Sequence, residues 1–199
     1  MKQHFTFKTL TLLFGTLAAI CCTTIATSAL VLPDGRIKTC TLPNGTMVRE
    51  FHVPGPVGSY AGFTQFTPGG ATTTWNDAQM QNLANGAAQL AAQVYGPQLT
   101  PALQQRGVNL VIEQLAFHEC AHARLPTSNE YVANAESIKQ MQALGELLPG
   151  DLQWLAYFTS SLGAQPPQYG GSGAAFWQGT LQVLAQFPGA PTSLDSAPH

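Results

Sequence analysis

Charged residues are scarce in this chain of 199 residues, and they make up only 9% of it. Eight lysines and arginines stand against ten aspartates and glutamates, so the formal net charge is −2 at pH 7. Nucleic-acid binding needs clustered basic residues that neutralise phosphates, and their lack argues against that function. Beyond the N-terminal segment no stretch is apolar enough to cross a bilayer, so we expect no stable membrane insertion of the remaining chain.

The first 29 residues have the pattern of a signal peptide, which we assign to residues 1–29. Lys2 and Lys8 precede an apolar run over residues 10–20, and small residues lead to a cleavage position after Ala29 or, alternatively, after Ala26. An uncleaved membrane anchor is another possibility, although the run is short for about 30 Å of hydrocarbon. We therefore expect an exported protein, either periplasmic or secreted.

Cysteine is also rare, with four residues in the whole chain. Cys21 and Cys22 fall in the expected signal peptide, which leaves Cys40 and Cys120 in the mature protein. Two cysteines in one small domain often pair in an oxidising compartment. The sequence therefore favours a Cys40–Cys120 disulfide, and two separate buried thiols are the alternative.

The rest of the chain is long enough for one compact domain with its own core, which we place over residues 30–187. Strand patterns come first: residues 31–51 predict a β-hairpin around Pro43-Asn44-Gly45, and residues 60–66 and 71–75 predict further strands. Helical spacing follows over residues 80–94, 108–123, 130–148, 151–162 and 174–187. This order predicts an α+β fold, with a small antiparallel N-terminal sheet packed on a helical body and a flexible tail over residues 188–199.

The helix expected over residues 108–123 carries the segment His118-Glu119-Cys120-Ala121-His122. Residues four apart stand on one helix face, so the imidazoles of His118 and His122 can bind one zinc ion. Glu119 can then act as general base toward water that the zinc makes acidic. The pattern His-Glu-x-x-His is typical of zinc hydrolases. The simpler alternative is that both histidines are ordinary helix residues.

A third zinc ligand must come from elsewhere, because a catalytic zinc usually has three protein ligands. The segment Asn129-Glu130-Tyr131-Val132-Ala133-Asn134 follows closely, and together with the motif it resembles the gluzincin metallopeptidases over about residues 114–137. The resemblance implies that Glu130 is the third ligand and that Asn134, in place of the family's Asp, supports a zinc-bound histidine. The spacer between His122 and Glu130 is short for the family, and Glu136 is the alternative ligand.

The resemblance also implies one zinc per chain, a peptide or protein substrate, and an edge strand that binds the substrate backbone. It loosely includes the strand over residues 71–75, so Trp75 and Asn76 are candidates to line the substrate cleft. Hydrolysis further needs a donor near the developing oxyanion. The sequence does not choose among five candidates for that donor: His52, Arg124, Tyr131, Tyr157 and Tyr169.

The leading hypothesis is thus an exported zinc-dependent metallohydrolase that cleaves peptide bonds. Two other functions fit the same residues. Zinc could hold two helices together in a non-catalytic binding module, which would suit the short spacer and Asn134. The same metal chemistry could also hydrolyse a non-peptide amide of the cell envelope. The physiological substrate and the oligomeric state stay open.

Overall fold

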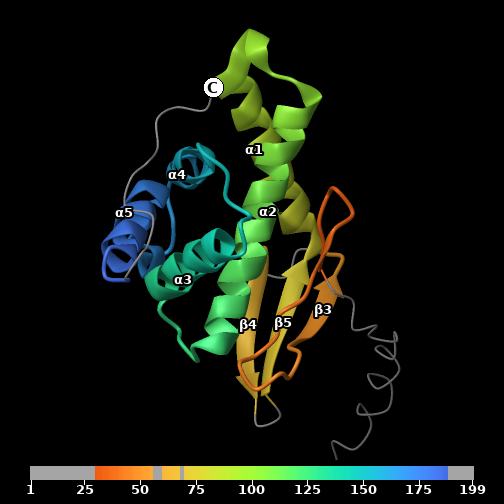
Figure 1. Cartoon of the computed structure of the whole chain (residues 1–199), viewed down its shortest axis with the longest axis vertical. Helices are drawn as coiled ribbons and strands as arrows, with labels where there is room; N and C mark the ends of the chain where they lie inside the picture. Colours follow the sequence, from red (N-terminus) through yellow and green to blue (C-terminus); the bar gives the residue numbers. More distant parts are fainter. Residues whose placement is uncertain (1–29, 56–59, 68–69, 188–199) are drawn as a thin grey trace, which may run out of the picture.

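The structure is a computed structural model, and it describes residues 30–55, 60–67 and 70–187. The expected signal peptide and C-terminal tail lie outside the described residues. Figure 1 shows a small sheet at one end of the molecule and a helical body beside and beyond it. The fold is α+β, as the sequence predicts. Within the described ranges, no helix combines the length and the apolar character that a membrane span requires.

Two small sheets form in the first part of the described chain. Their strands are β1 (Leu30–Val31), β2 (Ile37–Lys38), β3 (Arg49–Val53), β4 (Gly62–Thr67) and β5 (Gly70–Asn76). β1 pairs with β2 antiparallel, and the expected turn at Pro43-Asn44-Gly45 follows, closed by a hydrogen bond from Leu42 N to Thr46 O. The hairpin expected over residues 31–51 forms only in part: Thr41 and Met47 make an isolated antiparallel bridge across the turn, whereas β3 pairs with β5. The second sheet has the order β3-β5-β4, in which β5 runs parallel to β3 and antiparallel to β4. This sheet is therefore mixed.

The strand that the sequence predicts over residues 71–75 is the central strand β5 and not an edge strand. Because β3 and β4 flank it on both sides, its backbone is not available to an added peptide strand. The expectation that this segment binds an extended substrate is therefore wrong. The edge strand that packs on the helical body is β4.

Five α-helices and two short 3₁₀-helices complete the described part of the chain. They are α1 (Asp77–Tyr95), η1 (Gly96–Gln98), α2 (Pro101–Arg124), α3 (Glu130–Ala143), α4 (Asp151–Ser161), η2 (Pro167–Tyr169) and α5 (Gly173–Leu184). α2 begins at Pro101 rather than at residue 108, because the Thr100 hydroxyl caps it by accepting a hydrogen bond from Leu103 N. Proline fits this first turn, where its missing N–H has no helical partner.

Helix α2 is the axis of the domain and contacts α1, α3, α4 and β4. The main core cluster lies between the helices, and Leu110, Ile138 and Met141 are fully buried in it. Burial of each such side chain contributes about 1.5–3 kcal/mol. This packing holds the motif helix rigidly in the middle of the molecule.

A disulfide joins Cys40 to Cys120, which confirms the expected pairing. It connects the N-terminal hairpin to α2 inside the His-Glu-x-x-His segment. Both cysteines are buried beside Val48, Ala71 and Ala123. The side chain of Cys120 is thus directed to the hairpin, and its sulfur is bonded to that of Cys40.

Candidate metal centre

Three ligand atoms converge where α2 meets the start of α3. The Nε2 atoms of His118 and His122 are 3.1 Å apart, and Glu130 Oε2 lies 3.0 Å and 3.2 Å from them, respectively. All three side chains are largely buried. Ligand atoms around a tetrahedral zinc ion with bonds of about 2.0–2.1 Å are separated by roughly 3.3 Å. The spacing in the structure therefore fits a His₂Glu zinc site.

The loop between the two helices fixes the orientation of one imidazole. His122 Nδ1 lies 2.7 Å from the carbonyl oxygen of Thr127, to which it donates its proton. A neutral imidazole carries only one N–H, so the Nε2 of His122 keeps a lone pair that faces His118 and Glu130. Hydrogen bonds of this kind orient metal-binding histidines and raise their basicity.

Helix α3 begins at Glu130 itself, so the short spacer between His122 and Glu130 is long enough to bring this carboxylate back to α2. Asn129 caps this helix by accepting hydrogen bonds from Tyr131 N and Val132 N. Glu130 is therefore the first helical residue, and its carboxylate reaches back to α2. Glu136, the alternative ligand, instead accepts hydrogen bonds from Lys139 and Gln140.

The electrostatics of Glu130 suit a metal ligand. Burial acts to raise the pKa of this carboxyl, but hydrogen bonds with His118 and His122 outweigh it and lower the pKa to about 2. Glu130 is therefore an anion at neutral pH. One carboxylate and two imidazoles form a donor set that zinc prefers, so the residues present fit zinc.

Glu119 lies beside the three ligands and is only 4% exposed. Its Oε2 accepts a hydrogen bond of 2.8 Å from the Thr64 hydroxyl of β4. Burial raises the pKa of Glu119, although His118 and His122 act in the opposite direction. A raised pKa brings a carboxylate closer to the operating pH, which favours its action as a general base.

Strand β4 can pass this close to Glu119 because residue 62 is glycine. A Cβ at Gly62 would lie 2.5 Å from the Trp75 ring and 3.2 Å from Glu119 Cγ. Since the Trp75 ring is held in the core, it cannot move away. Gly62 thus allows the edge strand to cover the proposed base.

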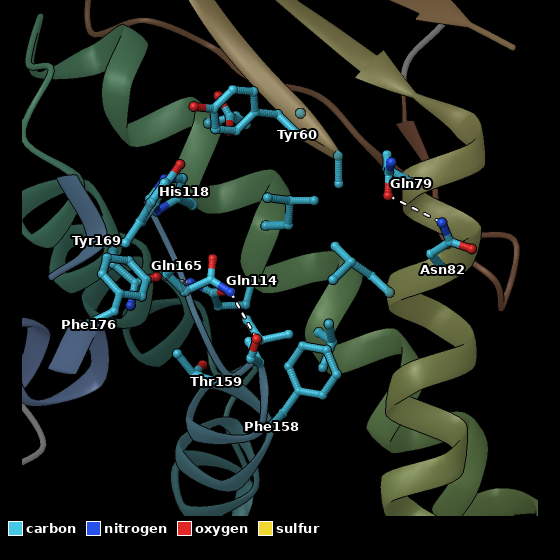
Figure 2. A pocket seen from close by; sticks show the side chains of 18 of the residues that line it. Tyr60, Gln79, Asn82, Gln114, His118, Phe158, Thr159, Gln165, Tyr169 and Phe176 are labelled. Carbon is cyan, nitrogen blue, oxygen red and sulfur yellow. Dashed lines mark hydrogen bonds between the residues drawn. The ribbon is translucent and has the colours of Figure 1, made fainter. Parts of the chain in front are cut away.

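A cavity of about 430 Å³ opens beside His118 and Glu119, and its walls come from α1, α2, α4, the loop after α4 and the start of β4 (Figure 2). Tyr169 of η2 lines this cavity near His118. Burial, together with the nearby carboxylates of Glu130 and Glu119, raises the pKa of Tyr169. Its hydroxyl therefore keeps its proton and can donate a hydrogen bond.

The other four candidates for the oxyanion donor have different surroundings. Tyr157 and Arg124 are exposed. His52 Nδ1 lies 2.7 Å from an oxygen of Asp77. The ring of Tyr131 packs against Phe176, with centroids 5.6 Å apart. Of the five, Tyr169 is the one that the structure brings to the cavity.

Trp75 and Asn76, which the sequence places at the substrate cleft, serve the fold instead. Trp75 is 2% exposed, and its Nε1 donates a hydrogen bond of 2.8 Å to Glu50 Oε2. Asn76 is 1% exposed, and its side chain caps α1 by accepting from Gln79 N. The physical reason is the central position of β5, which buries its end inside the domain.

Asn134, expected to support a zinc-bound histidine, makes its hydrogen bonds elsewhere. Its Oδ1 accepts from Gln114 Nε2, and its Nδ2 donates to Thr180 Oγ1 at 3.0 Å. The carbonyl of Thr127 supports His122 in its place. Sequence reasoning could not find this partner, since every residue carries a main-chain carbonyl.

Comparison of the chain with family models, with curated proteins and with solved structures gives no match. The case for function therefore depends on the site itself. Its described geometry combines three converging ligand atoms, a buried carboxylate beside them and an adjoining cavity.

Proposed function

We propose that this chain is a zinc-dependent peptidase. The observation that carries the proposal is the convergence of His118 Nε2, His122 Nε2 and Glu130 Oε2, all within 3.2 Å of one another. These three residues would hold the zinc ion. When bound, zinc supplies Lewis acidity that polarises a carbonyl group and makes water acidic.

The residues around the ligands have complementary roles in hydrolysis. Glu119 accepts the proton of the attacking water and passes it to the leaving amine. The hydrogen bond from Thr64 holds the Glu119 carboxylate in position. The protonated hydroxyl of Tyr169 donates a hydrogen bond to the negative charge that develops on the substrate oxygen.

The surroundings of the site favour an extended peptide as the substrate. β4 is an edge strand of its sheet and packs on α2 (Figure 1). Residues 60–62, which lead into this strand, line the cavity next to His118 and Glu119. A peptide that adds to the edge of β4 would therefore run past the proposed base.

The test combines metal analysis with peptide cleavage on the purified mature chain. We expect about one zinc per chain and cleavage of a quenched peptide library. Glu119→Gln should retain zinc and lose at least about 100-fold in kcat/KM, whereas His118→Ala should lose zinc. Glu136→Gln is the matched control, since this acid on α3 lies away from the ligands. Stoichiometric zinc without cleavage of any peptide would reject the peptidase in favour of a zinc-stabilised binding module.

A further inference from the structure

A chain of polar side chains behind the cavity has a fixed hydrogen-bond direction. Thr180 Oγ1 donates its single proton to the carbonyl oxygen of Phe176 at 3.0 Å, and a carbonyl can only accept. Thr180 must therefore accept from the Asn134 amide nitrogen, also at 3.0 Å. This leaves the Asn134 amide oxygen directed at Gln114, whose amide nitrogen donates to it.

Ser137 imposes the same direction independently. Its hydroxyl donates to the carbonyl of Asn134 at 2.7 Å and accepts from Gln114 Nε2 at 3.2 Å. Both protons of the Gln114 amide are thus donated into the protein, and its oxygen remains as an acceptor. Gln114 lines the cavity one helical turn before His118 (Figure 2). Since Asn134, Ser137 and Thr180 are at most 2% exposed, the network is held rigidly.

The cavity is otherwise suited to an uncharged group. Leu83, Val111, Leu115 and Phe158 supply apolar walls, and the lining assigned within the described residues includes no Lys, Arg or Asp. Its volume of about 430 Å³ falls in the usual range of roughly 300–1,000 Å³ for small-ligand sites. A carboxylate would lose hydration here without a Lys or Arg to pair with, and a cationic side chain could pair only with Glu119, the proposed base.

We propose that this cavity binds one substrate side chain next to the scissile bond, and that Gln114 selects a long uncharged side chain with a hydrogen-bond donor at its end. The inference rests on the proposed peptidase function. Glutamine is the protein residue that fits this description best: its stem packs on the apolar walls and its amide donates to Gln114 Oε1. Methionine has a similar length but offers no donor, and an ionised glutamate offers only acceptor oxygens to Gln114 Oε1 and would lose hydration without a cationic partner.

The test measures binding, so that it does not depend on turnover. Tripeptides of the form N-acetyl-Ala-Xaa-Ala-amide, with Xaa glutamine, methionine or glutamate, are titrated by NMR into the full mature chain with Glu119→Gln. We expect the glutamine peptide to bind about fivefold more tightly than the methionine peptide. The glutamate peptide should bind at least about tenfold more weakly than the glutamine peptide.

Two variants and one control assign the preference to Gln114. Gln114→Met should abolish the difference between the glutamine and methionine peptides. Thr180→Val removes the hydroxyl that accepts from Asn134 and thereby fixes the direction of the network. This variant should reduce the preference for glutamine even if Gln114→Met folds poorly. Gln105→Met, an exposed position on the same helix, should leave it unchanged.

The inference is overturned if the three peptides bind equally, if none binds, or if the glutamine preference survives both variants. The results that would reject the peptidase proposal differ from those that would reject the role of Gln114. A clear glutamine preference without hydrolysis by the unmodified chain rejects only the peptidase, whereas hydrolysis without a preference rejects only the role of Gln114.

Discussion

Breaking the Cys40–Cys120 disulfide should cost this domain a large part of its stability. The bond joins residues 80 positions apart in the sequence. It ties the N-terminal hairpin to α2, and both cysteines are buried at 6% and 8% exposure. Nearly half of the described domain therefore lies within the loop that the bond closes.

The size of the effect follows from the length of this loop. For a loop of 80 residues, the chain-entropy relation gives a stabilisation of about 4.5 kcal/mol at 25 °C. Domains of this size have free energies of unfolding of about 5–15 kcal/mol. The reduced protein should therefore be folded only marginally, or unfold at a much lower urea concentration.

Urea unfolding followed by circular dichroism, with and without dithiothreitol, measures this difference. The oxidised chain should exceed the reduced chain by about 3–5 kcal/mol in the free energy of unfolding. The double variant Cys40→Ala with Cys120→Ala is the control: it should resemble the reduced chain and show no response to dithiothreitol. A difference below about 1 kcal/mol between the oxidised and reduced chains would refute the reasoning.

Two further predictions concern Glu119, the proposed base, and the ion pair between Lys38 and Glu146. Thr64→Val removes the hydrogen bond to Glu119 Oε2, so kcat/KM should fall about tenfold with zinc content unchanged; an unaltered rate would show that this bond does not position the base. Hydrogen bonding to Lys38 lowers the pKa of Glu146 below its usual 4.5. The stability that the Lys38–Glu146 pair contributes is therefore present above about pH 4.5 and is lost as the pH falls through the lowered pKa. Urea titrations from about pH 7 to 3 should therefore show a shallower loss of stability for Lys38→Met than for the unmodified chain, and equal slopes would contradict the pairing.

Local features of the chain were predicted well from the sequence. The helix expected from residue 130 begins there, where Asn129 caps it, and the turn at Pro43-Asn44-Gly45 forms where expected. Such features depend on neighbouring residues in the chain, whose geometry is set by short-range sterics and hydrogen bonds. Helix ends were less accurate: α2 begins at Pro101 rather than at residue 108, because the periodic pattern does not reveal the Thr100 cap.

The order of strands in the sheet was not predictable in the same way. Residues 71–75 have the composition of a strand in any position, and composition does not decide which neighbours it pairs with. The structure makes this strand central, which buries Trp75 and Asn76 and makes β4 the edge strand beside the site.

The sequence by itself brought three candidate ligands together, although it left Glu136 as an alternative to Glu130. His118 and His122 share a helix face through the helical repeat, and one tight turn brings Glu130 back to them, so local geometry is sufficient. Only the tertiary structure decided what surrounds these ligands: Thr64 on Glu119, Tyr169 on the cavity wall and the directed network that ends at Gln114. Those contacts join segments far apart in the chain, and their positions depend on strand order and helix packing that no local pattern encodes.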